Sequence, residues 1–171
     1  GVLNINYSYA IEPNVFIQST VNRASEALSG KYTKQEKIEK LKNIARETVD
    51  INGIGSYTLG KHKKNLTPEQ AGIYKDLFET YFLKTFASRL AEYTNPEVRV
   101  DTSDKLNKNY TIVHSFLIAT EQRPKIKIDW RVYTKDPDNL FIRDLIIEGL
   151  SLARTQKEEF SSIILNNNGN I

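Results

Sequence analysis

Neither Cys nor Met occurs in this chain of 171 residues. Without Cys there is no disulfide, no Cys-based zinc site and no thiol nucleophile, although this absence leaves the cellular compartment open. Because translation starts at Met, the missing Met indicates that the chain has been processed or trimmed. A removed signal peptide would account for this, and so would deliberate trimming.

Residue patterns that carry catalysis or bind metals are scarce. The two histidines, His62 and His114, stand outside any H-x-x-x-H or H-E-x-x-H pattern, so we expect no metal site. A G-x-S-x-G nucleophile motif is also missing. The spacing of Gly53, Gly55 and Gly60 fits neither type of phosphate-binding loop, and no predicted strand precedes them. The sequence therefore predicts no cofactor.

Long apolar runs and an excess of one charge are lacking too. No apolar stretch approaches the roughly 18 residues of a membrane span. The net charge is +3, and 21 acidic residues are interspersed with 24 basic ones, which argues against a nucleic-acid-binding surface. With 39% hydrophobic and 26% charged residues, the composition is typical of a globular domain. We expect one domain over residues 1–171, with 1–11 and 166–171 loosely ordered.

The most informative stretch that is present runs from Thr67 to Tyr93. Thr67 with Gln70 matches a capping box, and Pro68 suits the first helical position, so a long helix should begin here. Its apolar residues recur at helical spacing and cover two faces. One face carries Tyr74, Leu77, Phe78, Tyr81 and Phe82, and the other carries Leu83, Phe86, Ala87, Leu90 and Ala91. A helix that is apolar on more than one side must be covered on more than one side.

Further helices are predicted on both sides of this stretch. Helical periodicity covers residues 15–29 and stops at Gly30, and a capping box of Thr33 with Glu36 starts a second helix that runs to about residue 48. The glycine-broken residues 50–66 are expected to form a loop or a short helical turn. A last helix should start at Ser151 as its N-cap.

After Pro96, apolar residues recur at every second position instead of at helical spacing. Four strands are predicted, at residues 98–102, 109–120, 125–132 and 140–147. The short turns between them favour antiparallel pairing. In the third strand the apolar side chains, including Trp130, alternate with charged ones, so one sheet face is buried and the other is wet. The sequence therefore predicts an α+β fold with several helices packed on one face of a curved four-stranded antiparallel sheet, enclosing an apolar pocket.

An excess of large apolar side chains faces the predicted interior. They come from the long helix, from the sheet and from the glycine-broken loop. The candidates are Tyr57, Leu59, Phe78, Phe82, Phe86, Val113, Leu117, Ile128, Trp130 and Val132. Periodicity alone does not distinguish an ordinary core from a cavity that binds an apolar ligand.

Two alternatives to a binding protein stay open from the residues alone. Asp144 and Glu148, four residues apart, can be interpreted as an acid–base pair, and Asp144 or His114 as the base of a small α+β enzyme. The plainer interpretation is that these carboxylates bond to backbone or to an arginine and that His114 is structural. The other alternative is a protein-interaction module with a solid core.

Three stretches of the sequence, which follow one another in the same order as in the family, resemble the MlaC, or toluene-tolerance, family of periplasmic phospholipid-binding proteins. They are YTLGKHKKNLTPEQAGIYKDLFETYFLKTFASRLAEY at 57–93, KIKIDWRV at 125–132 and IRDLIIEGLSLARTQKEEF at 142–160. The resemblance covers roughly residues 12–165. The chain departs from the family at Leu140, where a Trp is usual, at 156–158, where an Arg is usual, and in a shorter C-terminal helix.

The resemblance implies a shuttle rather than an enzyme. Such a protein carries phospholipid across the periplasm between an outer-membrane lipoprotein complex and an inner-membrane ABC transporter. Its ten candidate pocket residues would contact the acyl chains, and Lys61, Lys63 and Lys64 would meet the lipid headgroup or a membrane surface.

Overall fold

The structure, a computed structural model, describes residues 1–3 and 11–171. The prediction that residues 1–11 are loosely ordered falls mainly on residues 4–10, which lie outside the described part. The prediction for residues 166–171 also stays a prediction. Residues 167–170 form hydrogen-bonded turns, in which the Gly169 N–H donates to the Ile164 carbonyl at 2.9 Å.

Four predicted helices are confirmed, and the starts of three of them carry the predicted side-chain caps. Helix α1 spans Pro13–Ser29, α2 spans Lys34–Thr48, α4 spans Pro68–Leu90 and α5 spans Leu152–Asn166. Both capping boxes are complete, with Thr33 accepting from the Glu36 N–H and Thr67 from the Gln70 N–H. The Ser151 hydroxyl accepts from the Arg154 N–H at the start of α5. These caps depend on neighbours in sequence, which is why the sequence predicted them.

The prediction of a loop or a short helical turn at 50–66 underestimates the amount of helix in this stretch. This stretch forms the nine-residue helix α3, Ile51–Leu59, followed by the 3-10 helix η1, Gly60–Asn65. The Asp50 carboxylate caps α3 by accepting from the Gly53 N–H at 3.0 Å. A Cβ at Gly55 would lie 2.7 Å from the Phe78 ring, so the glycine allows α4 to approach closely. This packing outweighs the cost of about 1 kcal/mol that each glycine brings to a helix interior.

The four predicted strands are confirmed, with small shifts of their ends. They are β1 at Val98–Lys105, β2 at Tyr110–Leu117, β3 at Ile126–Tyr133 and β4 at Phe141–Ile147. A short fifth strand, β5 at Leu150–Ser151, pairs with β4, and all neighbours in the order β1-β2-β3-β4-β5 are antiparallel. Strand β5 is only two residues long, too short for a periodic pattern. Register shifts after Val100 and after Arg131 accompany the curvature of the sheet.

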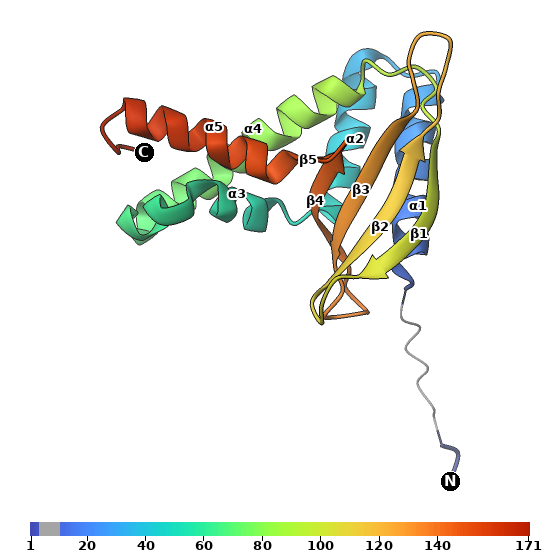
Figure 1. The fold of residues 1–171 in the computed structure, drawn as a ribbon, viewed down its shortest axis with the longest axis horizontal. Helices are drawn as coiled ribbons and strands as arrows, with labels where there is room; N and C mark the ends of the chain where they lie inside the picture. The colour runs from blue at the N-terminus through green and yellow to red at the C-terminus, as the bar shows by residue number, and fades with distance from the viewer. Residues whose placement is uncertain (4–10) are drawn as a thin grey trace.

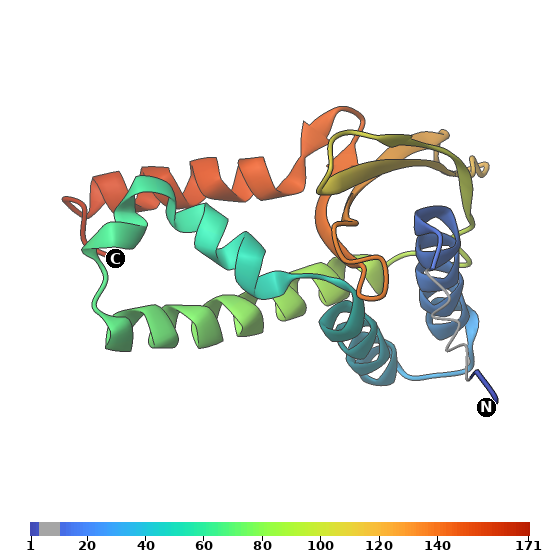
Figure 2. The ribbon, with the colours of Figure 1, turned by 90° about the horizontal axis from the view of Figure 1, so that it is seen from below.

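The helices divide into a layer under the sheet and an arm beside it. Helices α1 and α2 pack together, and α1 also packs against β1 and β2. Helices α3, α4 and α5 extend away from the sheet as an arm (Figures 1 and 2), and the other end of α4 packs on α2. Helix α4 therefore belongs to both parts.

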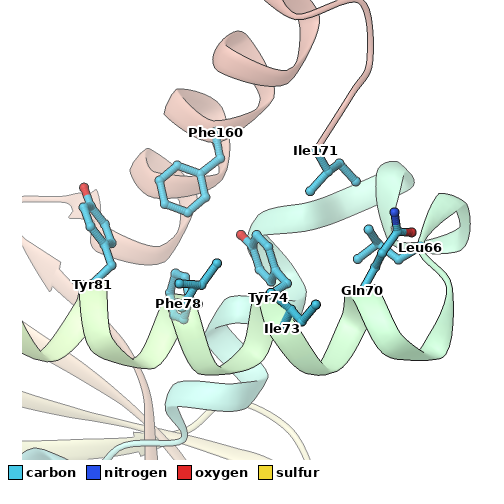
Figure 3. A pocket seen from close by; sticks show the side chains of 9 residues that line it. Leu66, Gln70, Ile73, Tyr74, Phe78, Tyr81, Phe160 and Ile171 are labelled. Atoms are coloured by element: carbon cyan, nitrogen blue, oxygen red, sulfur yellow. The ribbon is translucent and has the colours of Figure 1, made fainter.

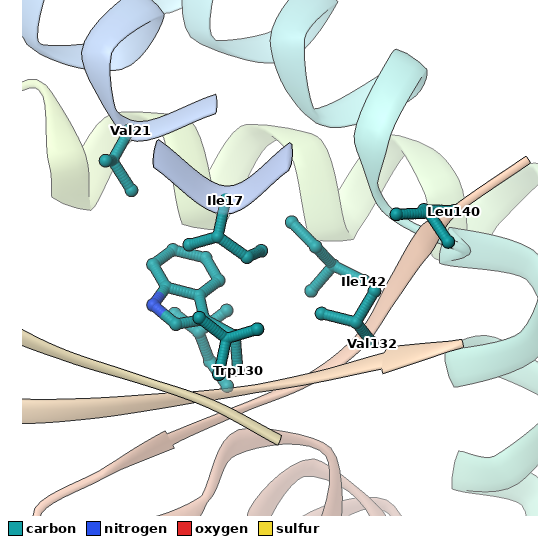
Figure 4. Packing of buried hydrophobic residues seen from close by; sticks show 8 residues of the cluster. Ile17, Val21, Trp130, Val132, Leu140 and Ile142 are labelled. Atoms are coloured by element: carbon teal, nitrogen blue, oxygen red, sulfur yellow. The ribbon is translucent and has the colours of Figure 1, made fainter. Parts of the chain in front are cut away.

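The core follows this division. Under the sheet, Ile17 and Val21 of α1 pack against Val113, Trp130 and Val132 (Figure 4). In the arm, Phe78 and Phe82 pack among α3 and α5 residues, while Ala87 of α4 packs against α1 and α2 residues. The prediction that α4 is covered on more than one side is thus confirmed. Leu77, however, is 65% exposed and Tyr81 is 45% exposed, so the buried stripe is narrower than the predicted face.

Candidate functional site

The main candidate site is an apolar cavity of about 300 Å³ between the helical layer and the sheet. We call it the sheet cavity. Helices α1, α2 and α4 form one wall, and strands β1 to β4 form the other. The larger apolar lining residues are Val21, Leu28, Leu41, Ile44, Val49, Phe86, Leu90, Val98, Leu117, Ile126, Ile128, Trp130, Ile142, Leu145, Ile147 and Leu152.

The Thr and Ser hydroxyl groups in this lining bond to backbone carbonyls. Thr20 donates to the Phe16 carbonyl and Thr48 to the Ile44 carbonyl, each at 2.8 Å along its own helix. Ser25 donates to the Pro96 carbonyl, also at 2.8 Å. Because these groups are already paired, they need no polar partner from a ligand. The wall is therefore suited to hydrocarbon.

Trp130 presents its ring to the cavity with its polar atom satisfied. The indole Nε1–H donates to the Ser115 hydroxyl at 2.8 Å, and that hydroxyl donates to the Ile128 carbonyl at 2.6 Å. Ser115 is fully buried on β2, directly beside β3. The relay fixes the ring orientation and leaves an apolar aromatic face toward the cavity.

The exposed lining residues mark where the sheet cavity reaches solvent. They are Arg89 in the last turn of α4, Tyr93 just after the end of α4, and Ile147 at the end of β4. The Arg123 guanidinium lies over the Tyr93 ring, with its carbon 5.3 Å from the ring centroid. The opening thus combines aromatic and apolar groups with the cationic side chain of Arg89, and Arg123 adjoins it through Tyr93.

Four of the ten predicted site residues line the sheet cavity, namely Phe86, Leu117, Ile128 and Trp130. Val113 and Val132 are fully buried in the core cluster that includes Trp130. Phe78 and Phe82 belong to the arm core. Whether any of these residues contacts a ligand stays a prediction.

The remaining two candidates lie away from this site. Leu59 is buried at the end of α3, and Tyr57 is 43% exposed with the Lys157 ammonium 4.8 Å above its ring. They were predicted from a loop that is in fact a helix, so their side chains follow helical rather than loop geometry. The lysines proposed for the headgroup lie in η1, at the end of the arm farthest from the sheet (Figure 2).

Sequence reasoning missed the contribution of α1 and α2 to the cavity. Val21, Leu41 and Ile44 line it, although the sequence analysis treated these helices as ordinary packing partners. Their apolar stripes were visible as a periodic signal. That signal identified a buried side but not what the side faces.

The possible acid–base residues are engaged elsewhere. His114 lies between two carboxylates, with Nδ1 2.8 Å from Asp129 and Nε2 2.7 Å from Asp104. Its neighbours Val113 and Ser115 on the strand are fully buried, so His114 projects from the opposite face of the sheet, away from the cavity. The hydrogen bonds that the His114 ring makes to Asp129, and secondly to Asp104, raise the pKa of His114.

The two carboxylates of the former acid–base hypothesis bond to backbone, as the plainer interpretation predicted. Asp144 accepts from the Ala153 N–H at 3.0 Å and from the Ser151 hydroxyl, at the start of α5. Glu148 accepts from the Lys127 N–H at 2.6 Å. Asp144 thus links β4 to the start of α5, and Glu148 links the turn between β4 and β5 to β3. Within residues 1–3 and 11–171, no group of three or more His, Asp or Glu side chains is arranged to hold a metal ion.

These features define a class: an α+β protein in which helices close an apolar cavity against a curved antiparallel sheet. The chain belongs to the MlaC family, because the family model described as MlaC protein matches residues 17–170. This confirms the resemblance found in the sequence.

A solved structure with the same fold is that of the phospholipid-binding protein from Ralstonia solanacearum in complex with a phospholipid. The likeness has a TM-score of 0.78 and 21% sequence identity, and it covers 93% of this chain and 90% of that one. At this identity it establishes the fold. No curated protein matches the chain.

Proposed function

We propose that this protein binds a phospholipid by its acyl chains in the sheet cavity and carries it between membranes. In this proposal the protein works in the periplasm, between an outer-membrane lipoprotein complex and an inner-membrane ABC transporter. The observation that carries it is the apolar wall, in which the hydroxyl groups of Thr20, Ser25 and Thr48 are already hydrogen-bonded. Membership of the MlaC family and the phospholipid in the Ralstonia solanacearum protein support it.

The energetics suit a carrier. Burying one CH2 group is worth about 0.8 kcal/mol, so an acyl chain gains several kcal/mol without any specific chemistry. The cationic opening near Arg89 and Arg123 favours an anionic headgroup at the solvent side. No described helix is long and apolar enough to cross a membrane.

The alternatives are less well supported. A catalytic base is expected to reach the ligand, but His114 projects from the other face of the sheet. The Asp144 carboxylate already accepts hydrogen bonds from Ser151 and Ala153. We therefore assign no catalytic role to either residue. A solid core, as the interaction-module hypothesis required, does not agree with a cavity of about 300 Å³.

Trp130 supplies a direct test because it is the single Trp of the chain. Phospholipids with brominated acyl chains should quench its fluorescence, and solvent extraction with mass spectrometry should recover lipid from the purified protein. Ile128→Trp fills the cavity and should strongly reduce the recovered lipid. Lys127→Trp, which adds the same ring at the exposed neighbouring position, should not. Absence of lipid and of quenching in the unmodified protein would refute the proposal.

Transport needs a separate measurement. Protein loaded from donor vesicles should deliver labelled phospholipid to acceptor vesicles faster than spontaneous exchange does. Ile128→Trp should lose this acceleration and Lys127→Trp should keep it. Tight binding without delivery would leave a lipid-binding protein and contradict the shuttle.

A further inference from the structure

The arm carries an exposed apolar groove of about 340 Å³ between α4 and α5 (Figure 3). We call it the arm groove. Its most exposed apolar side chains are Ile73 and Leu77 of α4 and Ile171 of the C-terminal segment, each at least half exposed. The Tyr74 hydroxyl in its wall lies 2.7 Å from the Thr58 hydroxyl and is thereby paired. An exposed group of large apolar side chains of this kind marks a binding surface.

Three exposed lysines stand beside the outer end of this groove. Lys61, Lys63 and Lys64 lie in η1, and Leu66, which directly follows η1, lines the groove. The Leu66 N–H donates to the Lys63 carbonyl at 3.3 Å, which fixes the lysines next to the groove. His62, between them, is only 7% exposed, so it anchors η1 while the lysines face solvent. We call η1 and the arm groove together the arm tip.

The positive charge of the arm tip is not neutralised by its surroundings. Residues 51–68 include no Asp or Glu. Within the part of the chain that the structure describes, no ion pair involves any of the three lysines. Their charge is therefore available to an anionic partner.

The acidic side chains of the arm point elsewhere. At about 100° per helical residue, Glu69, Asp76 and Glu79 of α4 project about 100° or more away from the centre of the groove face. On α5, Glu158 and Glu159 precede Phe160, whose ring contacts that of Tyr81 with the centroids 5.8 Å apart. This contact is at the end of the groove nearer the sheet. The outer end thus combines apolar and cationic groups.

The arm tip is also far from the opening of the sheet cavity. Pro68 begins α4, and Arg89, at that opening, lies in the last turn of the same helix. Roughly 30 Å of helix separates the two ends. A headgroup held at the opening therefore does not reach the lysines of η1, and these lysines need a different anionic partner.

We propose that the arm tip docks on an anionic membrane surface. Ile73 and Leu77 enter the boundary between headgroups and acyl chains, and the three lysines pair with lipid phosphates. A bilayer interface offers phosphate groups and hydrocarbon side by side, which is the combination that the arm tip complements. The inference goes beyond the proposed function, because this surface does not use the sheet cavity.

Vesicle co-sedimentation tests the charge requirement. The protein should bind vesicles in which about a third of the phosphatidylcholine is replaced by phosphatidylglycerol, and pure phosphatidylcholine vesicles much more weakly. Each lysine near an anionic leaflet contributes roughly fivefold to the affinity, so replacing the three η1 lysines by Gln should weaken binding by about 100-fold. The matched control replaces Lys105, Lys108 and Lys135, which are exposed in and beside turns of the sheet, and should weaken binding little.

The apolar requirement has its own pair of variants. Ile73→Gln combined with Leu77→Gln changes two exposed positions, so the fold is kept, and it should weaken binding several-fold. Leu106→Gln combined with Leu150→Gln makes the same change at exposed positions of the sheet region and should leave binding unchanged.

A fluorescent label reports whether the arm tip enters the bilayer. Because the chain has no Cys, an introduced Cys is the only thiol. Bimane on Leu77→Cys should shift its emission to the blue when anionic vesicles are added. Bimane on Lys75→Cys, an exposed position on another face of α4, should not.

Several results would overturn the inference. These are no binding of anionic vesicles, an equal loss in the two lysine variants, or the same emission change at positions 77 and 75. A wild-type dimer that the Ile73 and Leu77 variant dissociates would show that a second copy covers the groove, which also overturns it. Vesicle binding by a protein from which no lipid is recovered supports this inference and refutes the proposed function. Recovered lipid without vesicle binding does the reverse.

Discussion

At the scale of single residues, His114 is the clearest source of pH dependence. Its hydrogen bonds to Asp129 and Asp104 raise its folded-state pKa above the unfolded value of about 6.5. The stabilisation of the folded state by protonated His114 is therefore fully present below about pH 6.5. It is lost as the pH rises through the folded-state pKa of His114. We expect His114→Gln to lower the free energy of unfolding more at pH 5.5 than at pH 9. Urea denaturation at both pH values measures this difference.

A companion variant separates charge from packing. Asp104→Asn should lower the pKa of His114 toward its ordinary value, as followed by NMR titration, while Asp129 keeps its contacts with His114 and with Lys127, whose Nζ lies 3.6 Å away. Parallel pH profiles for wild type and His114→Gln would show that the histidine acts by packing alone.

At the scale of elements, the N-terminus of α4 depends on its capping box. The Thr67 hydroxyl accepts from the Gln70 N–H at 3.2 Å, and the Gln70 side chain accepts from the Thr67 N–H at 2.9 Å. Thr67→Ala removes the first bond and should lower the free energy of unfolding by about 1 kcal/mol. Chemical denaturation measures the change.

The same helix offers a matched control. Thr80 is an exposed interior residue whose hydroxyl donates to the Asp76 carbonyl within α4. Thr80→Ala makes the same chemical change where alanine is the better helix former, so it should leave stability unchanged or slightly raised. Similar losses for both variants would contradict a specific role of the cap.

At the scale of the whole molecule, lipid binding should be coupled to stability. A ligand that binds only the folded state at 100 times its Kd stabilises it by about 2.7 kcal/mol. For a chain of this size, each kcal/mol shifts the Tm by roughly 2–4 °C. If the proposed function holds, removing lipid should therefore lower the Tm by roughly 5–10 °C, as calorimetry would show.

Variants of the sheet cavity control this comparison. Ile128→Trp should give similar Tm values before and after lipid removal, because its cavity is filled. Lys127→Trp should keep the full difference. An unchanged Tm in the wild-type protein after verified removal of lipid would indicate that binding and folding are uncoupled.

Much of the fold could be predicted because its signals are local. A capping box joins residues three apart, and the alternation around Trp130 separates a buried from a wet face within one strand. The predictions that failed depended instead on contacts between segments that are distant in the sequence. Helix α3 was expected as a loop or a short helical turn because of its glycines, whereas the Phe78 ring against Gly55 decides the outcome. Leu77 and Phe78 are adjacent in the sequence, but only Phe78 is covered, because α3 and α5 lie on its side of α4.

The sequence by itself determined the helices with strong caps, the strands, the α+β class and the family resemblance. Each of these depends on residue order within one segment or on a motif. Only the tertiary structure decided that a cavity lies between Phe86 and Trp130 and that Tyr57 points elsewhere. Periodicity reports which side of an element is buried, but not how far away the opposing wall lies. That distance is set by how α1, α2 and α4 together pack against the sheet, and it separates a binding site from a solid core.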